Sequence, residues 1–413
     1  MAHSLELFVS VLEKNIDNRG KTPPLSPTGY PLIEVKHIQE DRLYPVFEDT
    51  KYVDQETWDT WFRAHLKPGD ILFSTVGSIA RSCMVPEKPK FCIAQNVLGF
   101  RVNRAKADPR FLYYAINDSF FQHEVNGRTI ETVQKSIKVH DLKTCRIPLP
   151  PLAEQKAIAA VLGALDDKIE LNRRMNATLE AMARALFQSW FVNFDPVRAK
   201  LDGRPPAALD SATAALFPGS FQESEAGHIP KGWEVVSLDA LASIRGGKQL
   251  PTEDCLPAGK FTVFGANGIM GYATESTHDG FVIAFGRVGA YCGSIHWSLD
   301  SAWINNNASA VVPLQWPAFV LQTMLNIDFN SMRTGSAQPF IPNSSLASAK
   351  VLRPSPQIAE AFCRIVEPLR RQQADNDKQS RTLATLRDTL LPKLLSGELS
   401  MAELEQAERK GGQ

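Results

Sequence analysis

The apolar residues of this chain form a long helical stripe that occurs twice. Apolar side chains recur every seven positions within residues 152–192, and a matching series follows 204 positions later, as between Ile158 and Phe362. A repeat of seven is typical of helices that pack along a common seam. At the same place in both copies a polar residue interrupts the stripe, Asn172 in the first and Asn376 in the second. Such an Asn lowers stability but fixes the register of a seam. We therefore predict two long helices paired in antiparallel orientation.

The seam contains further apolar positions in both copies, and Pro368 lies inside the second stripe. A proline inside a helix removes a backbone hydrogen bond, so we expect it to kink the second helix or to separate its first turns. The predicted seam residues are Ile158, Leu162, Leu165, Ile169, Asn172, Leu179 and Leu186 in the first helix, and Phe362, Leu369, Asn376, Leu383 and Leu390 in the second.

Two stretches with short strand-like segments precede the two helical stripes. The first contains GDILFSTVG, and the second has GFVIAFGRVGAYCGS at the corresponding place. A segment rich in Pro, Gly, Ala and Ser separates the two halves and is typical of a surface connector. The predicted fold is α+β, with two similar domains that contain twisted β-sheets and are separated by the helix pair in a pseudo-two-fold arrangement. Its parts are a first domain at 1–151, a helix at 152–192, the connector at 193–232, a second domain at 233–355, a helix at 356–400 and a tail at 401–413.

Charge and cysteine content restrict the class of protein. The 413 residues include 45 Lys and Arg and 45 Asp and Glu, which gives a net charge of zero. A DNA-binding protein that acts alone is usually basic, whereas a DNA-reading subunit of a larger complex need not be. The six cysteines include no CxxC pair, and the first residues do not resemble a leader peptide. Apolar runs stay well below the roughly 18 residues of a membrane span. We therefore expect a cytoplasmic protein with reduced thiols and no membrane segment.

No catalytic constellation is evident in the sequence. The chain contains no Walker loop, no catalytic motif of adenine methyltransferases and no paired His or Cys at metal-ligand spacing. Asp17, Glu34 and Lys36 resemble the residues of metal-dependent nucleases, with Glu34 and Lys36 on one face of a strand. Alternating charges are common on half-exposed strands, however, and the second domain has no counterpart. The sequence therefore favours a protein without catalytic activity, bound metal or cofactor.

Four segments resemble conserved parts of the specificity subunits of type I restriction-modification systems. They are IPLPPLAEQKAIAAVLGALDDKIELNRR at the first long helix, FDPVRAK in the connector, IPKGWEV at the start of the second domain and LLPKLLSGEL at the end of the second helix. The resemblance extends over essentially the full length of the chain. It implies two target recognition domains, at 1–151 and 233–355, that each read one half of a split DNA sequence. It also implies helices that set the gap between the half-sites and dock modification subunits.

The same resemblance implies the partners of the chain. They are double-stranded DNA, two modification subunits and restriction subunits, with S-adenosylmethionine, ATP and Mg²⁺ bound by the partner subunits. A protein-binding scaffold without DNA specificity is the alternative function. Helices about 60 Å long exceed the ~34 Å of one DNA turn, so domains at their two ends would reach separate segments of the major groove. Adding or deleting helical residues should then change the spacer and leave both half-sites unchanged.

Reading a DNA sequence requires side chains that reach base edges, supported by contacts to phosphates. Arg suits guanine and Gln suits adenine, and Arg287 is the foremost candidate because nearby glycines let its backbone approach DNA closely. The alternative is that these residues are ordinary surface polar groups, or that Gln134 and Gln338 cap backbone groups. The candidate DNA-binding residues are Ser74, Thr75, Ser78, Arg81, Arg128, Thr129, Gln134, Lys135 and Lys138 in the first domain, and Arg287, Arg333, Ser336 and Gln338 in the second.

A second set of candidates lies on the first helix, away from the main seam. It combines charged residues with an aromatic cluster that is costly to leave in water. The cluster is expected to pack on the second helix, on the connector or on a modification subunit, and a solvated face is the alternative for the charged members. The candidate partner-docking residues are Glu154, Gln155, Lys156, Arg173, Arg174, Phe187, Trp190 and Phe191.

Overall fold

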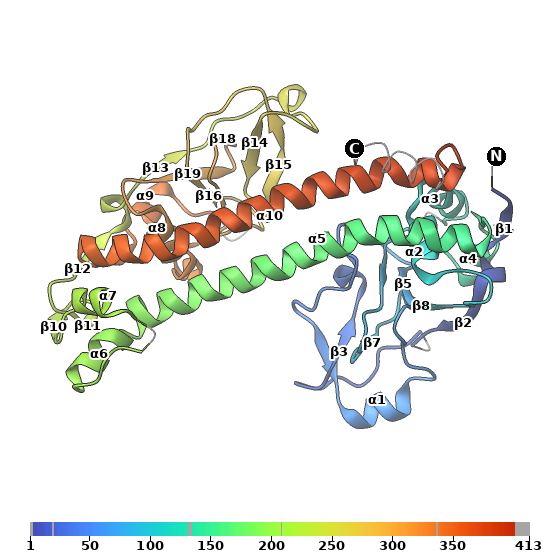
Figure 1. Cartoon of the computed structure of the whole chain (residues 1–413), viewed down its shortest axis with the longest axis horizontal. Coiled ribbons are helices and arrows are strands. Elements are labelled where there is room, and N and C mark those ends of the chain that lie inside the picture. The colour runs from blue at the N-terminus through green and yellow to red at the C-terminus, as the bar shows by residue number, and fades with distance from the viewer. Residues whose placement is uncertain (1–2, 19, 131–133, 208, 336–337, 401–413) are drawn as a thin grey trace, which may run out of the picture. The chain divides into compact units, whose positions relative to one another are not determined.

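The computed structural model describes residues 3–18, 20–130, 134–207, 209–335 and 338–400. The chain forms two compact units, the first comprising Met1–Leu171 and Gln379–Gln413 and the second comprising Asn172–Lys378. Each unit contains a β-sheet domain and a segment of both long helices, α5 (Leu152–Phe187) and α10 (Pro356–Ser396) (Figure 1). Both helices therefore continue from one unit into the other. This architecture confirms the predicted α+β class with two similar domains and two long helices.

The first unit is built on a four-stranded antiparallel sheet and a smaller three-stranded sheet. The four-stranded sheet has the order β2 (Leu12–Ile16), β8 (Val97–Val102), β5 (Ile71–Ser74), β6 (Ser82–Met84). The three-stranded sheet has the order β4 (Lys51–Val53), β3 (Tyr30–Ile33), β7 (Cys92–Ile93), and β3 runs parallel to β7. β1 (Leu5–Leu7) pairs separately with β9 (Arg146–Pro148). All four residues of β5 are buried, so this strand forms the centre of the domain.

Two consecutive short helices of the first unit begin at aspartate caps. The Asp108 carboxylate accepts from the Phe111 backbone N–H at the start of one helix, and Asp118 caps the next in the same way through Phe120. The first of these helices buries six consecutive residues, 111–116, against Phe73 and Phe100 of the sheet. The short helices are η1 (Phe8–Val11), η2 (Val35–His37), α1 (Gln55–Trp61), α2 (Pro109–Asn117), α3 (Ser119–Asn126) and α4 (Val139–Lys143).

The second unit repeats the topology of the first. Its four-stranded sheet has the order β13 (Ala242–Gly246), β19 (Ala308–Pro313), β16 (Val282–Gly286), β17 (Ile295–Ser298), and its three-stranded sheet has the order β15 (Gly268–Ala273), β14 (Phe261–Gly265), β18 (Ala302–Ile304). β14 runs parallel to β18, as β3 does to β7. β12 (Glu234–Ser237) pairs with β20 (Lys350–Arg353). The short helices are η4 (Leu238–Ala240), η5 (Thr252–Asp254), α8 (Pro317–Leu325), η6 (Phe329–Met332) and α9 (Asn343–Ala347). The faint repeat in the sequence is thus a repeat of the whole sheet topology.

The connector is an ordered part of the second unit, not a plain surface linker. It forms α6 (Asp195–Leu201), α7 (Ser211–Leu216) and the hairpin of β10 (Phe221–Ser224) and β11 (Gly227–Pro230). Its side chains Val197, Phe217 and Ile229 are buried in the same core as Trp233. The richness in Pro and Gly therefore reflects several tight turns between short elements.

The two long helices differ from their predicted forms in detail. α5 has 36 residues and continues as a single π-helical turn, Gln188–Val192. α10 has 41 residues and runs without a break through Pro368, so the expected separation of its first turns is wrong. Both Pro368 and Arg364 are exposed, and water can therefore satisfy the carbonyl that loses its donor. Gly397, with φ of 72°, follows the last helical residue and stops α10 before the predicted boundary at 400.

Within each unit the two helix segments pack in antiparallel orientation. In the second unit Asn172 Nδ2 donates to the Asn376 carbonyl at 3.2 Å, and Asn176 Nδ2 donates to the Gln373 carbonyl at 3.3 Å. Residue numbers thus rise along one helix as they fall along the other. In the first unit the Arg387 guanidinium binds the Asp166 carboxylate. Of the predicted seam residues, Ile158, Leu162, Ile169, Asn172, Phe362 and Asn376 are buried, and Leu165, Leu179, Leu186, Leu369, Leu383 and Leu390 are half-buried.

Candidate nucleic-acid interface

Three segments of the first unit converge on one surface beside the carboxyl end of β5. The backbone N–H of Thr75, in the turn between β5 and β6, donates to the Asn96 carbonyl in the turn between β7 and β8 at 2.9 Å. Ile137 N–H donates to the Thr75 carbonyl at 3.0 Å, and Gly77 N–H donates to the Lys135 carbonyl at 2.9 Å. The two loops selected from the sequence therefore meet, and a third turn joins them. We call this surface the three-loop surface of the first unit, formed by residues 75–81, 94–96 and 134–138.

The second unit contains the same surface, formed by residues 287–294, 305–307 and the described parts of 333–341. Arg287 N–H donates to the Asn307 carbonyl at 3.2 Å, and Ile341 N–H donates to the Arg287 carbonyl at 2.9 Å. Gly289 N–H donates to the Pro339 carbonyl at 2.9 Å. Gly77 and Gly289 occupy the same place in the two loops with φ of 77° and 80°, a conformation that favours glycine. The chain therefore carries two copies of one loop arrangement.

Several predicted DNA-binding residues are exposed on these surfaces. Ser78, Gln134, Lys135 and Lys138 are exposed in the first unit, and Arg333 and Gln338 are exposed in the second. Arg287 is half-buried, and its Nε donates to the Asn306 carbonyl at 3.2 Å, which holds the guanidinium on the three-loop surface. The role of these residues in DNA contact stays a prediction. Ser336 lies outside the described residues.

Ser74 and Thr75 are buried, which corrects their assignment as DNA-binding residues. The Ser74 hydroxyl donates to the Ser78 carbonyl at 2.5 Å and accepts from the Arg81 backbone N–H at 3.0 Å. The Thr75 hydroxyl donates to the Asn96 carbonyl at 3.2 Å. These hydroxyls stabilise the loop and are not available to a ligand, because they are buried and already hydrogen-bonded. The local sequence does not reveal the contacts that bury them.

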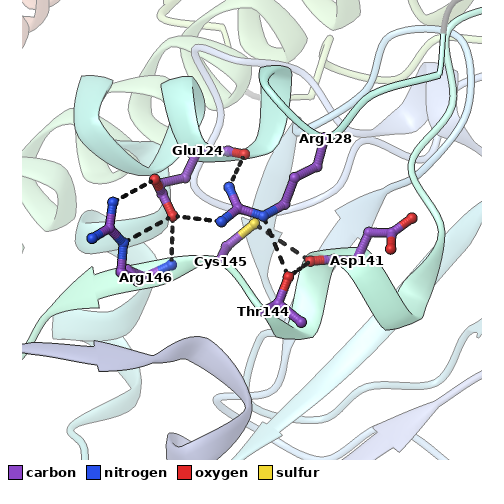
Figure 2. A network of polar contacts seen from close by, with 6 residues as sticks. All are labelled: Glu124, Arg128, Asp141, Thr144, Cys145 and Arg146. Atoms are coloured by element: carbon purple, nitrogen blue, oxygen red, sulfur yellow. Dashed lines mark hydrogen bonds and ion pairs between the residues drawn. The ribbon is translucent and has the colours of Figure 1, made fainter.

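Arg128 and Thr129 belong to an internal network and do not extend from the loop as the sequence suggested. Figure 2 shows Arg128 directed at Glu124, with Nη1 donating to the Glu124 carbonyl at 2.7 Å and Nη2 lying 3.1 Å from the carboxylate. Arg146 contacts the same carboxylate at 3.2 Å. The Thr129 hydroxyl donates to the Val125 carbonyl at 3.0 Å. Arg81 is less constrained than Arg128. Its Nε lies 3.0 Å from Glu40 Oε1, but Glu40 is well exposed and such surface ion pairs are weak.

Replacing Glu124 with glutamine is expected to cost the first unit about 1.5–3 kcal/mol, the range for hydrogen bonds to a charged group. Partial burial raises the pKa of Glu124, but hydrogen bonds from Arg146 and the charge of Arg128 outweigh it, so the pKa lies below its usual value. The stabilisation is therefore complete above the unfolded pKa of about 4.3 and is lost as the pH falls through the lower folded pKa.

Urea denaturation of the wild type and the Glu124→Gln variant at several pH values measures this effect. The difference in stability should be full at pH 7, should begin to fall below about pH 4.3 and should close once the pH is below the lowered folded pKa. Glu40→Gln is the matched control, because its carboxylate is exposed and its ion pair with Arg81 should contribute below about 1 kcal/mol. A difference that persists unchanged into acid would show that the network does not depend on the charge of Glu124.

The third turn of each surface supplies polar residues that were not selected from the sequence. Gln95 and Asn96 are exposed in the first unit, and Asn306 is exposed in the second, beside the half-buried Asn307. Amide side chains can form paired hydrogen bonds with adenine. The signal was present as AQN and NNN at matching places after a short buried strand. The correspondence between these two segments can be recognised only when the two domains are aligned by their strands.

Half of the predicted partner-docking residues are buried, which corrects that assignment. Gln155 accepts from the Asp108 N–H at 2.9 Å and donates to the Pro150 carbonyl at 2.8 Å. Phe187, Trp190 and Phe191 are buried in the core of the second unit, where they meet the connector and α10. A buried side chain cannot dock a partner. Of the remaining candidates, Lys156 and Arg174 are exposed, and Glu154 and Arg173 are half-buried.

The nuclease-like residues do not share a strand. β3 ends at Ile33, Glu34 caps the following 3-10 turn, and its carboxylate lies 2.7 Å from Lys51 Nζ. Within the described residues, no three His, Cys, Asp or Glu side chains are grouped so that they could hold a metal ion. Over the same part of the chain, every helix is too short or too polar to cross a membrane.

Comparison with known proteins finds similarity to one class of proteins. Residues 14–181 match the family model described as the type I restriction modification DNA specificity domain. The HindI specificity subunit of Haemophilus influenzae is 23% identical over 406 residues, covering 81% of this chain and 87% of that protein. The MjaIX specificity subunit of Methanocaldococcus jannaschii is 24% identical over 358 residues, covering 76% and 75%. Residues 14–181 thus match a DNA specificity domain, and most of the chain is similar to specificity subunits of type I restriction-modification systems.

A solved structure has the same fold. The crystal structure of the type I restriction-modification S subunit from M. genitalium matches with a TM-score of 0.51 and 20% sequence identity. The match covers 95% of this chain and 99% of that one. At 20% sequence identity this match shows only that the two folds are alike.

Proposed function

We propose that this chain is the non-catalytic subunit that gives a type I restriction-modification complex its DNA sequence specificity. The observation that carries the proposal is the three-loop surface, which occurs once in each unit with the same backbone hydrogen bonds. Two copies of one surface suit a target in two parts, with one unit for each half-site. The similarity of the chain to specificity subunits of type I restriction-modification systems supports the same function.

Within each surface, exposed side chains divide into two roles. Lys135 and Lys138 suit phosphate contacts, because an ammonium group binds the backbone without regard to sequence. The amides of Gln95, Asn96 and Gln134 in the first unit suit base edges, as do Asn306 and Gln338 in the second. Arg287 and Arg333 are the candidates for guanine in the second unit. The base contacts of the two units would then differ, which allows two different half-sites.

The chain would act with DNA and with modification and restriction subunits. The doubled architecture suits two modification subunits, one for each copy of the repeat. Methylation with S-adenosylmethionine and cleavage with ATP and Mg²⁺ would take place on these partners. Lys156 and Arg174 on the exposed face of α5, together with Glu154 and Arg173, remain the candidates for docking.

Modified-base sequencing tests the proposed function. A methylation-free host would express this chain with its neighbouring modification subunit, and a control would express that subunit alone. A split motif with methyladenine in both halves, present only with this chain, is the expected result. If both proteins are soluble and associated but no motif gains methylation, the scaffold alternative is favoured.

Replacing Lys135 and Lys138 with alanine is expected to weaken binding of target and non-target DNA alike. Each lost phosphate contact should reduce the slope of log K against log salt by about 0.9, or about 2 for the pair. Titrations of the complex with target duplex over a range of salt concentrations measure this slope. Lys14 and Lys67, which are exposed on other segments of the same unit, provide the control pair. An unchanged slope would remove these lysines from the interface.

A further inference from the structure

The three-loop surface of the second unit carries exposed aromatic side chains. Tyr291 is 53% exposed and Phe340 is 38% exposed. They belong to the two loops that the hydrogen bonds from Gly289 to Pro339 and from Ile341 to Arg287 hold together, and Val288 forms a β-bridge with Phe340. Large aromatic side chains at such positions are costly in water unless a ligand covers them.

A third exposed apolar side chain contacts the Asn-rich turn. Met270 is 50% exposed, and its sulfur accepts from Asn305 Nδ2 at 3.5 Å. The next residue of that turn, Asn306, accepts from Arg287 Nε. Tyr291 and Phe340 are therefore part of the same surface as the polar candidates for base contact, and Met270 borders the turn that supplies Asn306.

The first unit has no aromatic residue at the corresponding positions. Ser136 forms the same two β-bridges in the first unit that Phe340 forms in the second. Ile79 stands two residues after Gly77, as Tyr291 does after Gly289, and is half-buried. Lys135 and Lys138 correspond to Pro339 and Pro342, 204 positions later. The two surfaces thus share a backbone arrangement but differ in chemistry, because the first is basic and polar whereas the second carries exposed aromatic side chains beside its polar residues.

We propose that Tyr291 and Phe340 contact thymine 5-methyl groups in the half-site read by the second unit. This inference rests on the proposed function of the chain in DNA recognition. The thymine methyl is the apolar group that base edges present in the major groove, and apolar side chains recognise it. Asn306 and Gln338, on the same surface, supply the hydrogen bonds that an adenine or another polar base edge requires. The two kinds of side chain together suit A·T pairs.

The test replaces thymine with uracil, which removes the methyl group and leaves every hydrogen bond of the base in place. The complex of this chain with its modification subunit is titrated with its target duplex and with duplexes that carry uracil at each thymine position in turn. Loss of one buried methyl should weaken binding about fourfold. We expect such a loss at one or more positions of one half-site, and a smaller effect in the other.

Protein variants assign this effect to the two aromatic residues. In Tyr291→Ala and Phe340→Ala, the preference for thymine over uracil should fall toward none in that half-site alone. Leu314→Ala is the matched control, because Leu314 is also exposed in the second unit but lies after β19. Its preference for thymine should equal that of the wild type.

Three results would overturn the proposal. The first is equal affinity for the thymine and uracil duplexes. The second is a preference for thymine that survives in both aromatic variants. The third is that the half-site read by the second unit contains only G·C pairs. In each of these the complex still methylates a specific sequence. Failure of the proposed function itself would be distinct, because no sequence would then be methylated in a manner dependent on this chain.

Discussion

Replacing Arg387 with alanine is expected to lower the free energy of unfolding of the first unit by about 3–5 kcal/mol, the cost of removing one partner of a buried ion pair. Arg387 Nη1 lies 2.6 Å from Asp166 Oδ1, and the Tyr114 hydroxyl donates to Asp166 Oδ2 at 2.6 Å. The Asp166 side chain is only 4% exposed. Burial lowers the pKa of Arg387, but the negative charge of Asp166 outweighs burial and holds this pKa above its usual value. Without the arginine, the carboxylate would stay buried with Tyr114 as its remaining partner.

Segment-resolved amide hydrogen exchange measures this loss, because it separates the stability of α2 in the first unit from that of α8 in the second. Protection should fall in α2 and stay unchanged in α8. Arg381→Ala, an exposed arginine on the same helix, is the control and should change stability by less than about 0.5 kcal/mol. Replacing the pair together, with Arg387→Met and Asp166→Leu, should recover most of the loss because no unpaired charge remains. A loss below about 1 kcal/mol in Arg387→Ala would mean that Asp166 reaches water.

The long helices could be predicted from the sequence because their pattern is local and repeated. A seven-residue spacing is visible without knowledge of any distant contact, and its recurrence after 204 positions excludes most chance patterns. The likeness of the two domains could be predicted for a related reason, since each presents the same succession of short apolar segments, but the order of the strands in the sheets could not. The loop candidates followed from turn residues between those segments, and the structure brings the two loops together.

The accessibility of individual side chains could not be predicted in the same way. Gln155 stands in a charged segment of a helix that looks exposed, yet it is buried and accepts from Asp108, which lies 47 positions away. The ion pair of Asp166 joins residues 221 positions apart. Such contacts depend on how elements pack, which no local pattern encodes. The exposed amides of the third turn were missed because a turn of two or three residues has no periodicity.

The polar layer of the helix seam should control the spacer between half-sites. In the second unit Asn172 and Asn376 are buried, and Asn376 Nδ2 donates to Asn176 Oδ1 at 2.8 Å. Gln373 Nε2 donates to the Asn176 carbonyl at 3.0 Å. A polar layer of this kind satisfies its hydrogen bonds in one register only. Because α5 and α10 both continue from one unit into the other, their register and the separation of the two half-sites are linked.

Replacing Asn172 and Asn376 together with leucine is therefore expected to relax the spacer while leaving stability unchanged or raised. The double change removes the donor to Asn176 Oδ1, but Asn176 is half-buried and water can replace that donor, so the cost is small. A slip of one heptad moves a helix by about 10 Å, which corresponds to about three base pairs of DNA at 3.4 Å each. Modified-base sequencing should then find the same two half-sites with more than one spacer length, where the wild type has one.

Leu179→Met is the matched control, because it changes an apolar seam position and leaves the polar layer intact. It should keep the single spacer. A single unchanged spacer in the double leucine variant would contradict the assignment of register to the asparagines. Register would then rest on Arg370, which is buried and contacts Glu180 of α5 and Gln322 of α8. Adding Arg370→Met to the double variant separates the two cases. If the spacer relaxes only after this third change, Arg370 is the residue that fixes the register.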